Sequence, residues 1–119
     1  MVLNTRLSRR AWITGAIAVG LVGAAKAQQV DINGAYRAEG RYPDGTPYAG
    51  RAILSEANGT VRVSWIIDGQ SYAGTGVRQG QVVAVDWGQP EPIVYVVMAN
   101  GSLHGTWADG LALERLIRQ

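Results

Sequence analysis

The chain has 119 residues, with 11 basic and nine acidic side chains, one histidine and no cysteine. The lack of cysteine excludes disulfide bonds, thiolate nucleophiles and cysteine-based metal sites. A single histidine is too few for the histidine clusters of catalytic metal centres. Sixteen glycines disfavour helices and favour short strands joined by tight turns.

Residues 1–27 have the features of a secretory signal peptide. A basic start precedes an apolar run over residues 11–25, and an Ala-x-Ala sequence at residues 25–27 predicts cleavage after Ala27. The run is shorter than the roughly 20 residues of a membrane-spanning helix. An uncleaved membrane anchor is the alternative.

The pair Arg9-Arg10, followed by Trp12 and Ile13, resembles a twin-arginine export signal. We therefore expect a periplasmic or secreted protein that meets a membrane only during export. The mature part, residues 28–119, is long enough for one small domain.

Removal of the signal changes the electrostatic character of the chain. The mature part keeps all nine acidic residues but only seven arginines, so its formal net charge is −2. No positive excess remains to neutralise phosphates, and nucleic acid is therefore excluded as an expected partner.

Turn dipeptides recur along the mature part, and Asn-Gly or Asp-Gly between apolar runs is the strongest short hairpin signal. A seventh turn is expected at the proline-containing segment 88–92. Seven turns predict eight strands. The six X-Gly turns are Asp44-Gly45, Asn58-Gly59, Asp68-Gly69, Gln79-Gly80, Asn100-Gly101 and Asp109-Gly110.

The segments between these turns alternate as strands do. Residues 60–67 and 81–87 place valines and one tryptophan each on a single face, and in 102–108 His104 points away from Leu103 and Trp107. Residues 93–99 are apolar on both faces, which predicts a central or doubly covered strand. Residues 111–117 have a helical alternative, but a strand is favoured because it closes the sheet.

The predicted fold is an all-β, eight-stranded antiparallel up-and-down barrel, similar in outline to calycins and avidin. Strands of about seven residues leave little interior room for a ligand. The repeated phrases DGTPYAG (44–50) and DGQSYAG (68–74) are interpreted as turn and curvature geometry, with glycine beside a bulky ring allowing the sheet to bend. A twice-used ligand motif is the less favoured interpretation.

Several stretches resemble a family of short exported bacterial proteins that are often labelled fibronectin-binding protein or left without a function. The resemblance covers roughly residues 34–116 and implies a small exported β-rich protein. One departure is GLALERL, where members of that family tend to carry another glycine before the glutamate. The stretches that carry the resemblance are GAYRAEGRYPDGTPYAGRAIL, VSWIIDG, GTGVRQGQVVAV, VYVVMANGSLHGTW and LERL.

Arg78 shares a predicted strand face with Tyr72 and so points inward, while Glu114 lies on the closing strand. A structural Arg78–Glu114 ion pair that fixes the register is the favoured interpretation. The alternative is an Arg78 that anchors a ligand carboxylate inside the barrel. The mature part has three tryptophans and five tyrosines but no phenylalanine, which predicts that the ring N–H and O–H groups have polar partners.

We expect a non-enzymatic binding module without metal or cofactor, whose partner is either a small apolar or aromatic ligand or an envelope or extracellular protein. A structural or envelope-adhesion protein is the alternative, and an enzyme without a recognisable motif comes third. No catalytic residue is assigned, since His104 and Asp86 have no evident catalytic partners. The pattern does not predict the oligomeric state. The candidate ligand-binding residues are Arg78, Tyr72, Tyr48, Trp65, Tyr95 and Trp107.

Overall fold

A computed structural model describes residues 29–119, and the predicted signal peptide, with its cleavage position after Ala27, lies outside them. The described chain forms eight strands joined by turns. They are β1 (Gly34–Arg41), β2 (Pro47–Ala57), β3 (Thr60–Ile67), β4 (Gln70–Gln79), β5 (Val82–Asp86), β6 (Ile93–Val97), β7 (Leu103–Trp107) and β8 (Ala112–Arg118).

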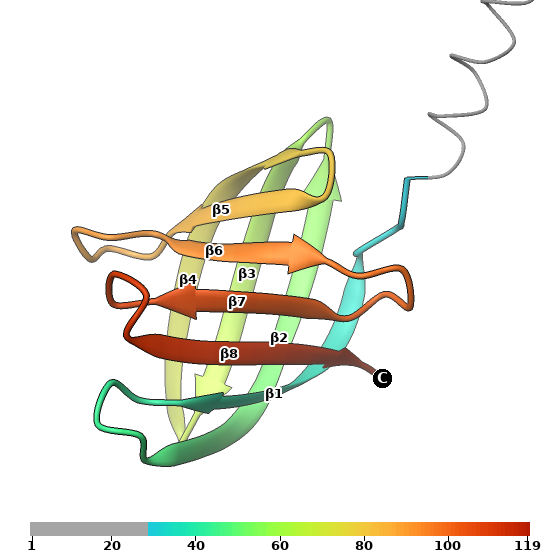
Figure 1. Cartoon of the computed structure of the whole chain (residues 1–119). Coiled ribbons are helices and arrows are strands. Elements are labelled where there is room, and N and C mark those ends of the chain that lie inside the picture. The colour runs from blue at the N-terminus through green and yellow to red at the C-terminus, as the bar shows by residue number, and fades with distance from the viewer. Residues whose placement is uncertain (1–28) are drawn as a thin grey trace, which may run out of the picture.

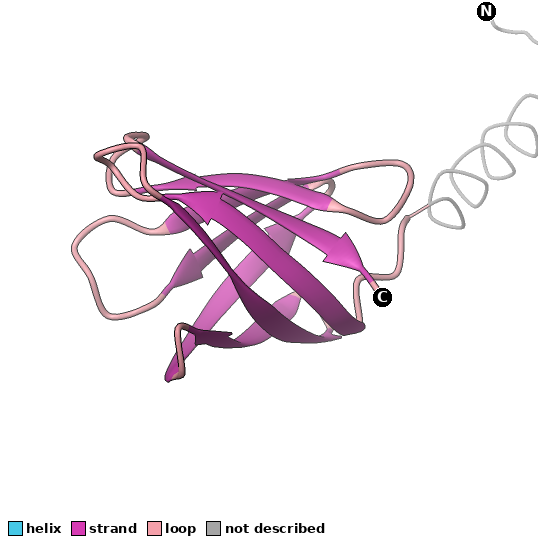
Figure 2. Ribbon diagram, turned by 90° about the horizontal axis from the view of Figure 1, so that it is seen from below, coloured by secondary structure: helices cyan, strands magenta, loops and turns pink. Residues whose placement is uncertain are grey.

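The strands form a closed antiparallel barrel in which each strand pairs with its neighbours in sequence (Figure 1). β1 also pairs with β8, from Tyr36 opposite Arg118 to Arg41 opposite Leu113, and this pairing closes the ring. Figure 2 shows the strands running obliquely around the enclosed space, with turns at both ends. The predicted eight-stranded up-and-down barrel is confirmed, and residues 111–117 contribute a strand rather than a helix.

Two hairpin turns show why the X-Gly dipeptides specify the fold. Asn58-Gly59 has φ angles of 54° and 81°, and Asp68-Gly69 has φ angles of 52° and 76°. Positive φ at both central residues gives the twist that matches two antiparallel strands, and asparagine, aspartate and glycine tolerate it best. The local sequence therefore sets both turns without help from the core.

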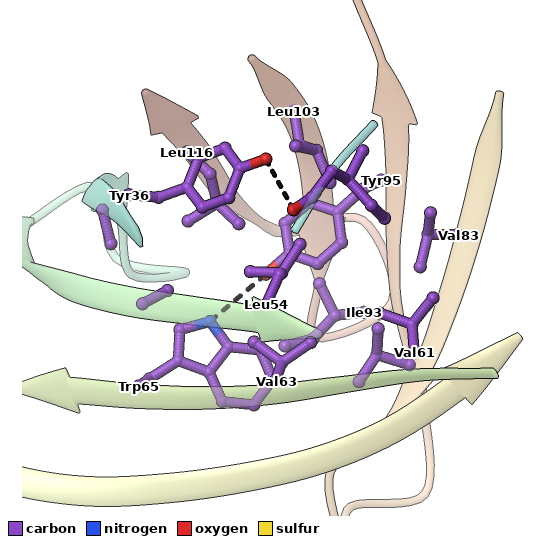
Figure 3. Close-up of a cluster of buried hydrophobic side chains, with 14 of the residues drawn as sticks. Tyr36, Leu54, Val61, Val63, Trp65, Val83, Ile93, Tyr95, Leu103 and Leu116 are labelled. Carbon is purple, nitrogen blue, oxygen red and sulfur yellow. Dashed lines mark hydrogen bonds between the residues drawn. The ribbon is translucent and has the colours of Figure 1, made fainter. Parts of the chain in front are cut away.

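The barrel interior holds one continuous apolar core. In β3 the inward positions Val61, Val63, Trp65 and Ile67 are buried, and their neighbours face outward. Figure 3 shows Trp65 and Tyr95 pointing toward each other among valine, leucine and isoleucine side chains from several strands. The same alternation around the ring fills the middle of the barrel with side chains.

The strand lengths vary around the expected seven residues: β2 has 11 residues and β4 has 10, whereas β5, β6 and β7 have five each. Of the two interpretations of β6, the central strand is correct: β6 pairs with β5 and β7, and its outer face is not covered, since Val94 and Val96 are exposed there. A closed barrel makes every strand central in the sheet while leaving one face in contact with solvent, so apolar character on both faces did not require a cover.

Within residues 29–119 no helix is long and apolar enough to cross a membrane.

Candidate ligand-binding site

A pocket opens at one end of the barrel, which we call the mouth. The mouth is the end formed by the β1–β2, β3–β4, β5–β6 and β7–β8 turns. The pocket has a volume of about 140 Å³, similar to the roughly 150 Å³ of an engineered protein cavity that holds benzene. Its lining consists of Tyr42, Tyr48, Trp65, Ile67, Tyr72, Trp87, Ile93, Trp107 and Glu114.

Aromatic rings in mutual contact make up one wall of the pocket. The centroid of the Trp107 ring lies 5.5 Å from that of Trp87 and 6.1 Å from that of Tyr42, and both pairs are nearly edge to face. The centroid of the Tyr48 ring lies 4.8 Å from that of Tyr42 and 6.2 Å from that of Trp107. These separations and orientations are those at which aromatic pairs attract one another. The wall is therefore formed by rings that hold one another in place.

Glu114 of β8 is a buried acidic side chain in this lining and is only 6% exposed. Its Oε1 accepts a hydrogen bond of 2.8 Å from the Tyr48 hydroxyl, and its Oε2 accepts one of 3.1 Å from Trp65 Nε1. The Tyr95 hydroxyl also donates to Oε2. The carboxyl group thus holds three rings from three other strands.

Two glycines create the space for this arrangement. Glu114 lies opposite Gly40 of β1 and Gly105 of β7. A Cβ atom on Gly40 would lie 2.2 Å from Cζ of Tyr48, and one on Gly105 would lie 2.5 Å from Cδ1 of Tyr95. The absence of both side chains lets the two tyrosine rings lie flat against the sheet and reach the carboxyl group between them.

The predicted polar partners of the rings are confirmed. Every tryptophan N–H and every tyrosine hydroxyl in residues 29–119 donates a hydrogen bond. Within the pocket, Trp107 Nε1 donates to the Tyr48 hydroxyl at 3.1 Å, and Trp87 Nε1 donates to the Glu91 carbonyl at 3.1 Å. The other donors are Tyr36, Tyr42, Tyr48, Tyr72, Tyr95 and Trp65.

Burial raises the pKa of Glu114 above its ordinary value of 4.5, although the hydrogen bonds from Tyr95, Tyr48 and Trp65 oppose the shift. The salt bridges among the described residues join Arg37 and Arg115 to Glu39 and Arg78 to Glu56, so none of them reaches Glu114. Burial and the neighbouring Glu114 also raise the pKa values of Tyr48 and Tyr95. Both hydroxyls therefore stay protonated and remain donors at neutral pH.

The raised pKa of Glu114 makes stability pH-dependent with a definite sign. The folded protein keeps this proton over a pH range in which the unfolded chain has released it, so stability falls as pH rises through that range. We expect the unfolding free energy of the wild type, relative to Glu114→Gln, to decrease from about pH 4 toward pH 7. Urea titrations of both proteins across this range measure the difference.

Acids whose pKa values are lowered in the fold, such as Asp31 and Asp44, are present in both proteins. Their contributions to the unfolding free energy therefore cancel when the two proteins are compared. A difference that is constant, or that grows in favour of the wild type as pH rises, would contradict a raised pKa for Glu114.

The predicted Arg78–Glu114 pair is wrong. Arg78 is buried at the end of the barrel opposite the mouth, where Nη1 lies 2.9 Å from Oε1 of Glu56. The guanidinium also donates to the carbonyls of Val30 at 2.7 Å and Gly80 at 2.8 Å. It therefore fixes the segment before β1 and the β4–β5 turn, and it is not part of the mouth pocket.

Of the other predicted residues, Tyr48, Trp65, Tyr72 and Trp107 do line the pocket. Tyr95 is completely buried and does not line the pocket, but its hydroxyl donates to Glu114 and accepts a hydrogen bond of 3.3 Å from Trp65 Nε1. Four lining residues and the part that Glu114 plays were not predicted from the sequence. The four residues are Tyr42, Ile67, Trp87 and Ile93. Turn positions and strand alternation could have indicated them, because all four lie near mouth turns.

Across residues 29–119, no group of three or more histidine, aspartate or glutamate side chains is arranged to hold a metal ion. His104 is exposed on the outer face of β7. Comparison of the chain with protein-family models and with curated proteins gives no match. The resemblance to proteins labelled fibronectin-binding stays a prediction.

Proposed function

We propose that the protein is an exported, non-enzymatic binding protein that holds one small organic ligand in the mouth pocket. The observation that carries this proposal is a pocket lined by three tryptophans and three tyrosines around a single buried carboxyl group. Ligand sites are typically apolar and aromatic with a few fixed polar groups. Export is inferred from the signal-like residues 1–27, which lie outside the described part of the chain.

The pocket is largely preorganised for binding. Trp65, Tyr48 and Trp107 are held in one hydrogen-bonded chain that ends on Glu114, and Trp87 is tied to the adjacent turn. Side chains that are already ordered lose little further entropy when a ligand arrives. The energy of contact with the rings is then available for affinity.

Titration with a panel of small organic compounds of about six to eight non-hydrogen atoms tests the proposal. We expect at least one compound to change tryptophan fluorescence in a saturable way, because all three tryptophans of the described chain line the pocket. Trp107→Leu is expected to weaken that binding by about tenfold or more, since it removes a central ring of the wall. His104→Ala, on the outer face, is the matched control and should bind normally.

A native mass spectrum of the protein purified gently from its own host provides an independent test. An added mass that is lost in Trp107→Leu supports the pocket as its site. If no compound gives a saturable signal and the native protein carries no added mass, the proposed function is wrong and an envelope-adhesion role is favoured instead.

A further inference from the structure

We infer that the ligand of the mouth pocket is a small organic cation, an amine or a quaternary ammonium ion, with Glu114 as its counter-charge. This inference rests on the proposed binding function and names the chemical class of its ligand. Three observations carry it: the aromatic wall, the buried acid without a cationic partner, and the charge of the turns around the mouth.

The wall supplies the neutral part of a cation site. Tyr42, Trp87 and Trp107 are only partly buried, and Tyr72 is 41% exposed at the entrance. The face of an aromatic ring carries a partial negative charge and attracts cations, most strongly for tryptophan. Several rings around one small pocket are the usual arrangement for recognising an ammonium group.

Glu114 supplies a charge that the fold does not compensate. Its carboxyl group is buried beside the pocket and accepts three hydrogen bonds, but it takes part in none of the salt bridges of residues 29–119. A buried carboxylate without an opposite charge is unfavourable, and a cation brought into contact with it removes much of that cost. Oε1 accepts one side-chain hydrogen bond and so retains capacity for a further donor, such as a protonated amine.

The turns around the mouth add a directional field. Each of the four mouth turns has an exposed acid, and a further acid, Asp86, ends β5. Two basic residues also lie near these turns: Arg41, whose Nη1 donates to the Gly45 carbonyl, and Arg51, which pairs with Ile66 of β3. The buried Arg78 lies at the opposite end. Acids around an opening attract cations and repel anions. The four turn acids are Asp44, Asp68, Glu91 and Asp109.

The opposing possibility is a protonated Glu114 that donates a hydrogen bond to a neutral ligand. Choline and its neutral isostere, 3,3-dimethylbutan-1-ol, separate the two cases because they have the same shape and differ in charge. We expect isothermal titration calorimetry on the purified protein to show that choline binds about tenfold or more tightly than the isostere. Added salt should weaken the binding of choline and leave that of the isostere nearly unchanged.

Glu114→Gln preserves the size of the side chain and removes its charge. It is expected to weaken choline binding by about tenfold and isostere binding by less than about threefold. Glu39→Gln is the control, because it removes an exposed carboxylate that pairs with Arg37 and Arg115 outside the mouth pocket. Should circular dichroism show that Glu114→Gln does not fold, Trp87→Leu replaces it and should weaken choline binding about fivefold and isostere binding by clearly less.

The outcomes separate the class of ligand from the existence of the site. Isostere binding as tight as choline binding, lost in Trp107→Leu, overturns the cationic class and leaves the binding function standing. If only neutral compounds of the panel bind, the cationic class is likewise overturned and the binding function still stands. No saturable binding by any charged or neutral compound overturns both the class and the proposed function.

Discussion

Gly40→Ala is expected to lower the free energy of unfolding by about 3 kcal/mol or more. A Cβ atom at this position would lie 2.2 Å from Cζ of Tyr48 and 2.4 Å from the backbone oxygen of Leu113. The ring can turn away, but the backbone oxygen belongs to the β1–β8 pairing that closes the barrel. Relief of the clash therefore has to distort the closure itself. Urea denaturation followed by circular dichroism measures the loss.

The same substitution is expected to disturb the mouth pocket in any protein that still folds. Tyr48 cannot hold its hydrogen bonds to Glu114 and from Trp107 if its ring is pushed off the sheet. Gly69→Asn is the control, because its Cβ would meet nothing within 4 Å and asparagine tolerates the φ of 76° at that turn. A Gly40→Ala protein as stable as Gly69→Asn would show that the glycine is not needed for the close approach.

Arg78→Ala is expected to cost about 3–5 kcal/mol of stability, the range for breaking one partner of a buried ion pair. Arg78 is 7% exposed, and its loss leaves the Glu56 carboxylate and the carbonyls of Val30 and Gly80 without their donor. The segment before β1, which includes the completely buried Ile32, loses its link to the β4–β5 turn. Thermal and urea denaturation both measure the effect.

Arg115→Ala provides the comparison, because Arg115 pairs with Glu39 at 2.7 Å on the exposed face. Exposed pairs contribute less than about 1 kcal/mol, so this variant should stay near the wild type. Arg78→Ala that folds with undiminished stability but no longer binds ligand would revive the interpretation of Arg78 as a ligand anchor. An Arg78→Ala protein that is less stable but binds ligand in the mouth pocket normally supports a purely structural role for Arg78.

The barrel could be predicted from the sequence because its signals are local. Asn58-Gly59 and Asp68-Gly69 each fix a hairpin through their own φ angles. Alternation in β3 then assigns every residue to the inside or the outside of the sheet. A chain of successive hairpins with one apolar face has few ways to bury that face other than closure.

The predicted Arg78–Glu114 pair is wrong because the strand face of a residue does not fix its height in the barrel. Both side chains do point inward and are buried, as predicted. Arg78 comes just before the β4–β5 turn and Glu114 just after the β7–β8 turn. Successive turns of an up-and-down barrel lie at alternate ends, so these two residues start at opposite ends of the molecule (Figure 1). Counting turns would have separated them.

The repeated phrase combines geometry with a place in the pocket. In both copies Asp-Gly makes a mouth turn, and the tyrosine that follows, Tyr48 or Tyr72, lines the pocket. The glycine two residues later approaches a neighbouring strand, with a Cβ on Gly50 falling 2.2 Å from the Ile66 oxygen and one on Gly74 falling 2.9 Å from the Asp86 oxygen. The curvature interpretation explains the glycines, and the position at the mouth explains the tyrosines. The pocket itself depends on which rings meet across strands, which no local pattern reveals.

The most direct test of a mouth site is a nuclear magnetic resonance titration with choline that follows the indole N–H signals of Trp65, Trp87 and Trp107. Each indole has a different hydrogen-bond partner, on Glu114, the Glu91 carbonyl and Tyr48 respectively. We predict that all three signals shift together and saturate at one ligand per protein, while backbone signals around Arg78 stay unchanged. Indole signals that remain still, or shifts confined to the Arg78 end, would contradict a binding site at the mouth.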